Sequence, residues 1–314
     1  MQVIDIHPPL APKYRPQEPI VLALGFFDGV HRGHQAVIRQ ARVAADAAKC
    51  PLAVMTFDIH PAVIYQKVPA DTIKYLSPRQ RKVELMAELG VDCLYFVHFT
   101  PEFARQAPQT FVDDYLVGLN AQVVVAGFDY TYGKKAIANM QTLPQYARGR
   151  FDIITVPEHV EDGTKISSTR IRDALDQGDV DTANALLGYA YRTTGIVVHG
   201  EARGRTLGFP TANIDTPNSQ RLPGIGIYTV KMKVRGQWYP AMASVGRNVT
   251  FGAGRAVTLE INLFDFDADI YDEPVVVEWR HYLRGEIKFA DAAGLITQLE
   301  HDRAASKAFL EARP

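Results

Sequence analysis

The stretch "IVLALGFFDGVHRGHQAVI", residues 20–38, holds the clearest fold signal in the chain. An apolar run ends in a glycine-rich turn that carries His31 and His34, and a helical pattern follows at once. A strand that passes directly into a helix is typical of a parallel sheet covered by helices. The first backbone amides of such a helix lack intrahelical partners and attract phosphate. The stretch therefore predicts an α/β domain with a phosphate site at this turn.

The rest of the first half repeats this alternation of strand and helix. Four further apolar runs are typical of strands buried on both faces: residues 51–57, 93–99, 122–128 and 151–157. One intervening helix has clear end signals, with Ser77 as its expected N-cap, Pro78 at its first position and Gly90 just past its end. We predict a Rossmann-like parallel sheet with helices on both faces, whose ligands bind at the carboxyl ends of the strands.

The second half has a different periodicity. Short β-rich segments separated by Gly, Pro and Asn follow Gly188 and indicate a sandwich or a barrel. A helical pattern returns over residues 290–312, with Leu295, Leu299 and Phe309 as its apolar positions. With 314 residues the chain has room for two domains, which we place at 1–186 and 187–314.

Composition limits the possible partners. The chain carries 34 Lys and Arg against 35 Asp and Glu, so no general basic field favours nucleic acid or anionic membrane. No apolar stretch reaches the ~18 residues of a spanning helix, and the N-terminus lacks the pattern of a secretion signal. Cys50 and Cys93 lie in or beside apolar runs, which indicates buried thiols. We expect a cytoplasmic protein, monomeric or weakly homo-oligomeric, without nucleic-acid or membrane partners.

The histidine pair allows three interpretations. Gly29 and Gly33 leave backbone exposed, and the imidazoles of His31 and His34 could then stabilise a reacting phosphoryl group. A zinc site is a second possibility, but it requires a third ligand that the nearby sequence does not offer. Two loop histidines that cap a helix are the third, and the bare spacing alone favours them. The preceding strand and the glycines favour the phosphate site.

The motif "GFFDGVHRGH" (25–34) resembles the nucleotidyltransferase motif of the bacterial bifunctional riboflavin kinase/FAD synthetase family. Further segments resemble family signatures in the family's order: "MTFDIHP" (55–61), "GFDYTYG" (127–133), "ISSTRIR" (166–172), "GRTLGFPTANI" (204–214), "GIYTV" (226–230) and "LEINLFDFDADIY" (259–271). The resemblance covers nearly the whole chain. It implies an FMN adenylyltransferase domain over 1–186 and a riboflavin kinase domain over 187–314, the second an all-β Greek-key split barrel with a C-terminal helix.

For the first domain the resemblance implies three groups of residues. Catalytic roles fall to His31, His34 and Arg172, and Arg172 shares a helical face with Ser168. ATP contacts fall to Gly25, Phe26, Gly29, Gly33, Ser168 and Thr169. Flavin contacts fall to Phe57, His60, Asp129 and Tyr130. Core packing is the plainer explanation for one of Tyr130 and Tyr132, and a rigid loop before Pro61 is an equally economical one for His60.

For the second domain the residues alone favour ordinary roles. Thr211 and Asn213 are two apart and so face the same way on an extended segment, where their oxygens would suit Mg²⁺. Gly204 and Gly208 could let amides surround phosphates, although no Walker lysine follows them. Glu260 lies opposite the apolar positions 257, 259, 261 and 263. The resemblance implies a Mg²⁺ site at Thr211 and Asn213, ATP contacts at Gly204 and Gly208, and Glu260 as the base that activates riboflavin.

The expected function is therefore ATP-dependent phosphorylation of riboflavin to FMN, followed by adenylylation of FMN to FAD with release of pyrophosphate. Mg²⁺ with ATP would serve both steps. One alternative is a single active site beside a degenerate flavin- or nucleotide-binding module. Another is a non-catalytic flavin or nucleotide sensor that contacts RNA, which the balanced charge disfavours. Two loops, 134–140 and 246–254, depart from the family pattern; the second keeps Thr250 but lacks a proline.

Overall fold

The computed structural model describes residues 1–161, 163–200, 204, 207–246 and 257–313. It divides into two compact units, Met1–Ser168 and Thr169–Pro314. Helices α7 (Ser168–Asp176) and α8 (Val180–Leu187) therefore lie almost wholly in the second unit, whereas the sequence placed them in a first domain ending at 186. The division between the two activities at 186/187 stays a prediction.

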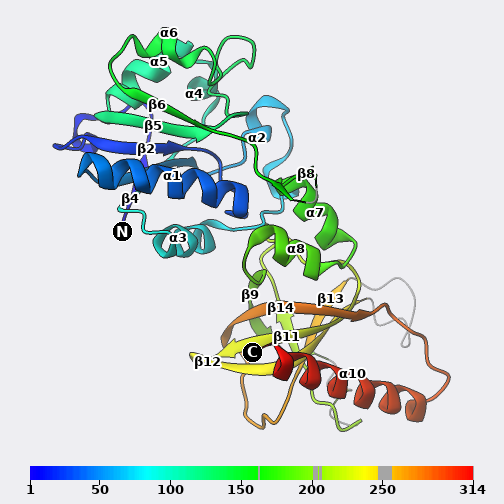
Figure 1. The fold of residues 1–314 in the computed structure, drawn as a ribbon. Helices are drawn as coiled ribbons and strands as arrows, with labels where there is room; N and C mark the ends of the chain where they lie inside the picture. Colours follow the sequence, from blue (N-terminus) through cyan, green and yellow to red (C-terminus); the bar gives the residue numbers. More distant parts are fainter. Residues whose placement is uncertain (162, 201–203, 205–206, 247–256, 314) are drawn as a thin grey trace. The chain divides into compact units, whose positions relative to one another are not determined.

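The first unit is built on a six-stranded parallel sheet in the order β1-β4-β3-β2-β5-β6 (Figure 1). Its strands are β1 (Gln2–Ile6), β2 (Ile20–Leu24), β3 (Leu52–Phe57), β4 (Cys93–Val97), β5 (Ala121–Gly127) and β6 (Asp152–Val156). Every residue of β2 and β3 is buried, as their apolar runs predict. The expectation that β6 is buried on both faces is wrong, because β6 is an edge strand on which Asp152 and Thr155 are exposed. The other edge strand, β1, has only Ile6 buried and was not predicted.

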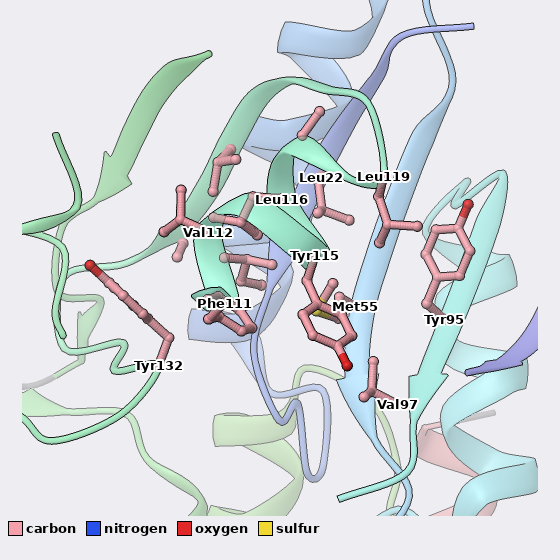
Figure 2. Close-up of a cluster of buried hydrophobic side chains, with 14 of the residues drawn as sticks. Leu22, Met55, Tyr95, Val97, Phe111, Val112, Tyr115, Leu116, Leu119 and Tyr132 are labelled. Carbon is pink, nitrogen blue, oxygen red and sulfur yellow. The ribbon is translucent and has the colours of Figure 1, made fainter. Parts of the chain in front are cut away.

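Helices cover both faces of this sheet. They are α1 (Arg32–Ala48), α2 (Ala62–Tyr65), α3 (Arg79–Glu88), α4 (Pro101–Arg105), α5 (Pro108–Phe111) with the π-helical turn η3 (Val112–Val117), and α6 (Leu143–Ala147). Helix α1 packs on β2 and β5 through Val37, Ile38, Ala41 and Ala45. Figure 2 shows Phe111, Tyr115 and Leu116 packed over Leu22 and Met55 on the other face. The predicted α/β fold is confirmed.

The start of α3 differs from the sequence expectation. Pro78, not Ser77, is the N-cap residue, and no side chain caps the helix. The Ser77 hydroxyl instead accepts a hydrogen bond from the amide of Gly29, at 2.7 Å. Gly90, with φ of +75°, does follow the end of the helix as predicted. Ser77 thus belongs to the glycine-rich turn rather than to the helix.

The second unit is a closed barrel of six antiparallel strands in the order β10-β13-β12-β11-β14-β9 (Figure 1). The strands are β9 (Arg192–Val198), β10 (Ala212–Asp215), β11 (Gly226–Val234), β12 (Gln237–Gly246), β13 (Thr258–Leu263) and β14 (Pro274–Arg284), and α10 (Ala292–Ala312) follows. Tyr228 and Trp279 meet edge to face inside the barrel, with ring centroids 5.1 Å apart. The predicted barrel with a C-terminal helix is confirmed.

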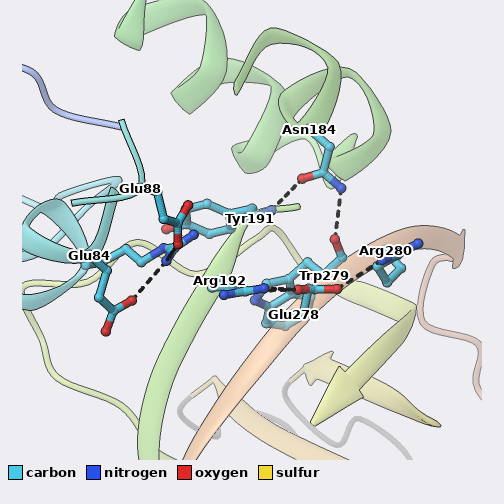
Figure 3. Close-up of polar contacts among 9 residues, drawn as sticks. Glu84, Glu88, Asn184, Tyr191, Arg192, Glu278, Trp279 and Arg280 are labelled. Atoms are coloured by element: carbon cyan, nitrogen blue, oxygen red, sulfur yellow. Dashed lines mark hydrogen bonds and ion pairs between the residues drawn. The ribbon is translucent and has the colours of Figure 1, made fainter. Parts of the chain in front are cut away.

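Polar side chains join the helices of this unit to the barrel. Figure 3 shows Asn184 of α8, whose amide donates to the carbonyl of Trp279 at 2.9 Å and accepts from the amide of Tyr191 at 2.7 Å. Figure 3 also shows the carboxylate of Glu278 between Arg192 and Arg280.

Helix α10 packs on the barrel through a mostly polar face. Its fully buried residues are Asp302, Ser306 and Leu310, whereas the apolar positions Leu295, Leu299 and Phe309 are partly buried. The Arg284 guanidinium of β14 forms an ion pair with Asp302, and the Thr229 hydroxyl of β11 donates to that of Ser306 at 3.0 Å. Leu299 packs at the rim, against the small cluster around Phe209.

Candidate functional sites

The first candidate site is the glycine loop, residues 25–34, which follows β2 and opens α1. His31 is the N-cap of α1, and its Nδ1 accepts a hydrogen bond from the amide of His34 at 3.3 Å. The two imidazole rings stack with centroids 3.6 Å apart. The capping interpretation is therefore correct for His31. Because Nδ1 is the acceptor, the proton of the neutral ring lies on Nε2, which can donate to an anion.

The charge of His31 is set by its burial. Only 5% of the residue is exposed, and burial lowers its pKa to about 4 despite the nearby carboxylates of Asp28 and Asp129. The imidazole is thus neutral at pH 7. It can offer a phosphate oxygen a hydrogen bond, but it adds no positive charge of its own.

The backbone of the glycine loop is unusual in three places. Phe27, Gly29 and Val30 have φ of +53°, +82° and +37°. A left-handed conformation suits glycine but is costly for the β-branched Val30. Gly25 has a different role, because a Cβ there would lie 2.7 Å from the Phe27 ring. A Cβ on Gly33 would likewise lie 3.2 Å from the His31 ring, so this glycine makes room for the histidine.

Groups that are distant in the sequence hold this loop, and these contacts were not predicted. The buried carboxylate of Asp28 accepts hydrogen bonds from the amides of Leu76 and Ser77, at 3.0 and 3.1 Å. The ammonium of Lys82 donates to the carbonyl of Phe26 at 2.7 Å. These contacts span about fifty residues of sequence, so no local pattern could indicate them.

Two further segments of the first unit reach the neighbourhood of the loop. The Ser168 hydroxyl donates to the carbonyl of Asp28 at 2.9 Å, so Ser168 contacts the loop, and its expected contact with ATP stays a prediction. Thr169 and Arg172 belong to the other unit, so their place beside the loop stays a prediction. Asp129 forms an ion pair with Lys165, at the end of the hairpin β7 (Val160–Glu161) and β8 (Thr164–Lys165). Lys165 was not predicted.

The aromatic residues expected to bind flavin lie in different surroundings. Phe57 is buried, and its ring meets those of Phe99 and Phe103. Tyr132 is buried in the core cluster, as Figure 2 shows, and Tyr130 is partly buried and packs against the same cluster. The structure leaves the flavin roles of Phe57 and Tyr130 as predictions.

His60 has a well-defined place beside the glycine loop. Its Nδ1 accepts from the amide of Ala62 at 3.1 Å, so its ring is fixed within its own loop. The ring meets that of Phe26 edge to face, with centroids 4.8 Å apart. This arrangement agrees with the rigid-loop interpretation and leaves the flavin contact of His60 a prediction.

The second candidate site lies where β10 meets β13 in the barrel. Asn213 pairs with Glu260 in the register, and the Thr211 hydroxyl lies 3.4 Å from a carboxylate oxygen of Glu260. Ala212 and Ile214 are buried, so Asn213 lies on the opposite face of its strand as predicted. The structure thus brings together the three polar residues that the sequence analysis singled out in this half.

Three glycines near the barrel site allow close backbone contacts or a left-handed backbone conformation. A Cβ on Gly200 would lie 2.0 Å from the Asn213 amide, and one on Gly204 would lie 2.2 Å from the carbonyl of Phe209. Gly208, with φ of +78°, is left-handed. Residues 201–203, 205–206 and 247–256 lie outside the described part of the chain, and Thr250 is among them.

The predicted apolar face of residues 257–263 differs from the structure at Val257. Leu259 and Ile261 are buried as expected, but Val257, just before the strand, is 43% exposed. Asn262 on the polar face is buried, and its amide is satisfied because it donates to the carbonyl of Pro210 at 2.7 Å. Glu260 is partly buried beside it. The bond from Asn262 ties the polar face of β13 to the segment that carries Thr211.

Comparison with known proteins assigns each unit to a family. Residues 13–170 match the family model for FAD synthetase, and residues 187–310 match that for riboflavin kinase. A protein of Listeria monocytogenes is 46% identical over 309 residues, which cover 98% of both chains. Proteins of Bacillus subtilis (43% identical, 90% of both chains) and Escherichia coli K12 (34%, 94% of both chains) also match. All three bear the name bifunctional riboflavin kinase/FMN adenylyltransferase.

The chain belongs to the bifunctional riboflavin kinase/FMN adenylyltransferase family. A solved structure from Streptococcus pneumoniae, described as a macrolide-efflux protein, shares the fold of this family member with a TM-score of 0.89. The two chains are 37% identical, and the match covers 98% of this chain and 99% of the other. Within the described residues, no helix is both long and apolar enough to cross a membrane.

One departure from the family pattern, the loop 134–140, is held by backbone hydrogen bonds and buried side chains in the adenylyltransferase domain. The amide of Tyr132 donates to the carbonyl of Ala138 at 3.1 Å, and Thr131 forms an isolated β-bridge with Asn139. Ala138 and Met140 are buried. The altered sequence therefore still closes as a hairpin on the core.

A zinc site at the histidine pair finds no support in this family member. Among the described residues, no group of three His, Cys, Asp or Glu side chains could hold a metal ion. The neutral oxygens of Thr211 and Asn213, beside the carboxylate of Glu260, suit a hard cation that shares the phosphates of a nucleotide.

Proposed function

We propose that the adenylyltransferase domain joins AMP from ATP to FMN at the glycine loop, and that the riboflavin kinase domain phosphorylates riboflavin at Thr211, Asn213 and Glu260. One observation carries this: the chain matches the family models for both activities, over residues 13–170 and 187–310, and the glycine loop and the cluster of Thr211, Asn213 and Glu260 lie in different compact units. Because both models match, the comparisons do not support a single live site beside a degenerate module.

In the adenylyl step, an oxygen of the FMN phosphate attacks the α-phosphorus of ATP. A new P–O bond forms, the bond to the β-phosphate breaks, and pyrophosphate leaves with the electron pair. The attacking phosphate is already an anion and requires no base. His31 donates a hydrogen bond from Nε2 to the phosphate, and His34, Arg172 and the amides at the start of α1 stabilise the remaining charge.

In the kinase step, the terminal hydroxyl of riboflavin attacks the γ-phosphorus of ATP, and ADP leaves. Glu260 accepts the hydroxyl proton, which its position beside Thr211 and Asn213 allows. Thr211 and Asn213 would hold Mg²⁺ shared with the nucleotide. When bound, this ion neutralises charge on the phosphates.

We propose that the enzyme is cytoplasmic and acts on small molecules. Its charges are balanced, with 34 basic and 35 acidic residues, which disfavours nucleic acid as a partner. Cys50 and Cys93 are free thiols, in keeping with a reducing compartment. We propose a monomer or a weak homo-oligomer.

Separate assays of the two half-reactions test the assignment. The protein is incubated with Mg²⁺ and ATP, and with either riboflavin or FMN, and the products FMN and FAD are separated. His31→Ala should lower FAD formation by about 100-fold and leave FMN formation intact, because it removes one donor to the transition state. Glu260→Ala should lower FMN formation and leave FAD formation from FMN intact.

Two outcomes would contradict the proposal. A single substitution that abolishes both reactions in a folded protein would refute the two-site assignment. The absence of both products with the wild-type protein would favour a flavin or nucleotide sensor instead.

A further inference from the structure

Lys82 is a buried cation that the mechanism above does not use. It lies on α3, is 3% exposed, and places its ammonium 2.7 Å from the carbonyl of Phe26 and 3.4 Å from the Thr56 hydroxyl. The ammonium also lies 4.3 Å from the centroid of the Phe26 ring. A lysine is almost never buried this fully without a partner, so these contacts indicate a specific role.

The carbonyl of Phe26 receives two donors from different elements. Thr56 at the end of β3 donates to it at 2.8 Å, and Lys82 donates from α3. Two residues further on, Asp28 and Gly29 are bonded to the segment just before α3, through Leu76 and Ser77. The first part of the glycine loop is therefore held on one side by buried hydrogen bonds from residues 76–82.

The loop needs such support because its backbone is strained. Phe27 and Val30 adopt left-handed conformations that cost free energy and persist only where the surroundings impose them. His31 follows directly and must present Nε2 to the phosphates. A shift of the Phe26 carbonyl would be passed along this short segment to His31.

We propose that Lys82 is a positioning residue for adenylyl transfer, whose ammonium fixes the carbonyl of Phe26 and through it the loop that carries His31. This inference rests on the proposed function of the first domain. The contacts of Lys82 are with the loop backbone, the Thr56 hydroxyl and the Phe26 ring, so we expect it to act through the geometry of the loop. Its loss should lower kcat more than it raises the KM for ATP, because misplacement of reacting groups weakens the transition state most.

The charge of Lys82 supplies a second readout. Burial lowers its pKa to about 8; the carboxylate of Asp28 opposes this shift and the guanidinium of Arg79 adds to it. The group is an ammonium below this pH and a neutral amine, a weaker donor, above it. FAD formation should therefore decline as the pH rises through about 8. The rate of FMN formation in the barrel should not show this decline, which we call the alkaline limb.

Four full-length variants test the proposal, with both half-reactions measured on each. Lys82→Met should lower the kcat of FAD formation by about 10-fold or more, with FMN formation within about twofold of the wild type. Lys82→Arg, which keeps a donor and a charge, should recover part of the rate. The alkaline limb should vanish in Lys82→Met and move to higher pH in Lys82→Arg, because arginine does not titrate there. Lys74→Met, which removes an exposed lysine before the same helix, is the matched control.

Thr56→Val provides the fourth variant, in case the first domain of Lys82→Met fails to fold. It removes the other donor to the same carbonyl and should lower the kcat of FAD formation while keeping the alkaline limb. The inference is overturned if Lys82→Met folds and keeps wild-type FAD formation, or if the alkaline limb survives in it. A wild-type protein that makes no FAD would instead overturn the proposed function.

Discussion

At the scale of the residue, His31 couples folding to pH. Its pKa is about 4 in the folded chain and 6.5 when exposed, so between these values only the unfolded chain binds the proton. Stability should therefore rise with pH over this window, by up to about 3 kcal/mol, and be complete above pH 6.5. Unfolding free energies of the first unit at pH 4.5 and 7 measure this difference.

His31→Asn is the informative comparison for this pH effect. Asparagine is a preferred N-cap residue, so the variant keeps the start of α1 and removes the titrating group. The pH dependence of stability should be weaker in the variant by the contribution of His31. An unchanged pH dependence would mean that the histidine is protonated equally in the folded and unfolded chains.

The position of the histidine pair could be predicted from local sequence, because His31 and His34 lie in one contiguous turn between a strand and a helix. Thr211, Asn213 and Glu260 were singled out by the family resemblance, and the strand register brings Asn213 and Glu260 together. Lys82 could not be found this way. A lysine inside a helical pattern is usually solvated, and its partner Phe26 lies 56 positions earlier.

At the scale of the element, the docking of α10 depends on a buried ion pair. Asp302→Asn would remove the carboxylate that pairs with the Arg284 guanidinium, whose side chain is only 17% exposed. Breaking such a pair from one side is costly, so we expect the second unit to lose roughly 3 kcal/mol of stability. Urea unfolding followed by tryptophan fluorescence measures it, because both tryptophans of the chain, Trp238 and Trp279, belong to this unit.

Lys307→Met is the control for that experiment. Lys307 lies on the same helix and pairs with Asp265 at the surface, where an ion pair contributes less than about 1 kcal/mol. Equal losses in the two variants would show that the Arg284 pair contributes no more than a surface contact. A loss confined to Asp302→Asn would support the buried polar interface.

Elements with strong apolar periodicity were predictable, and elements with mixed surroundings were not. The central strands β2 and β3 appear in the sequence as continuous apolar runs because helices cover both of their faces. The edge strand β1 mixes polar and apolar residues and gives no such signal. The side of α10 that faces the barrel could not be predicted from hydropathy, because a hydrogen bond and an ion pair between polar residues form part of this contact.

At the scale of the whole molecule, the glycine loop lies in one compact unit and the cluster of Thr211, Asn213 and Glu260 lies in the other. If FMN leaves the barrel before it is adenylylated, a mixture of His31→Ala and Glu260→Ala should make FAD from riboflavin. One protein then supplies FMN and the other consumes it. We expect FAD to appear after a lag that shortens as the protein concentration rises, measured by product separation over time.

The time course of the wild-type protein distinguishes release of FMN from direct transfer. If the wild type forms FAD from riboflavin without the lag that the mixture shows, the intermediate passes within one chain before it is released. The control is the wild-type protein at the same concentration, which should form FAD from riboflavin in either case.

The attachment of α8 to the barrel determines where a fragment that contains the second unit should begin. The kinase family match begins at 187, yet Asn184 bonds both Trp279 and Tyr191, and the compact unit begins at Thr169. A fragment that starts at 187 would expose the flank of β14 that α8 covers and lose the hydrogen bonds that Asn184 makes with Trp279 and Tyr191. A barrel expressed alone should therefore retain α7 and α8 if it is to stay soluble and folded.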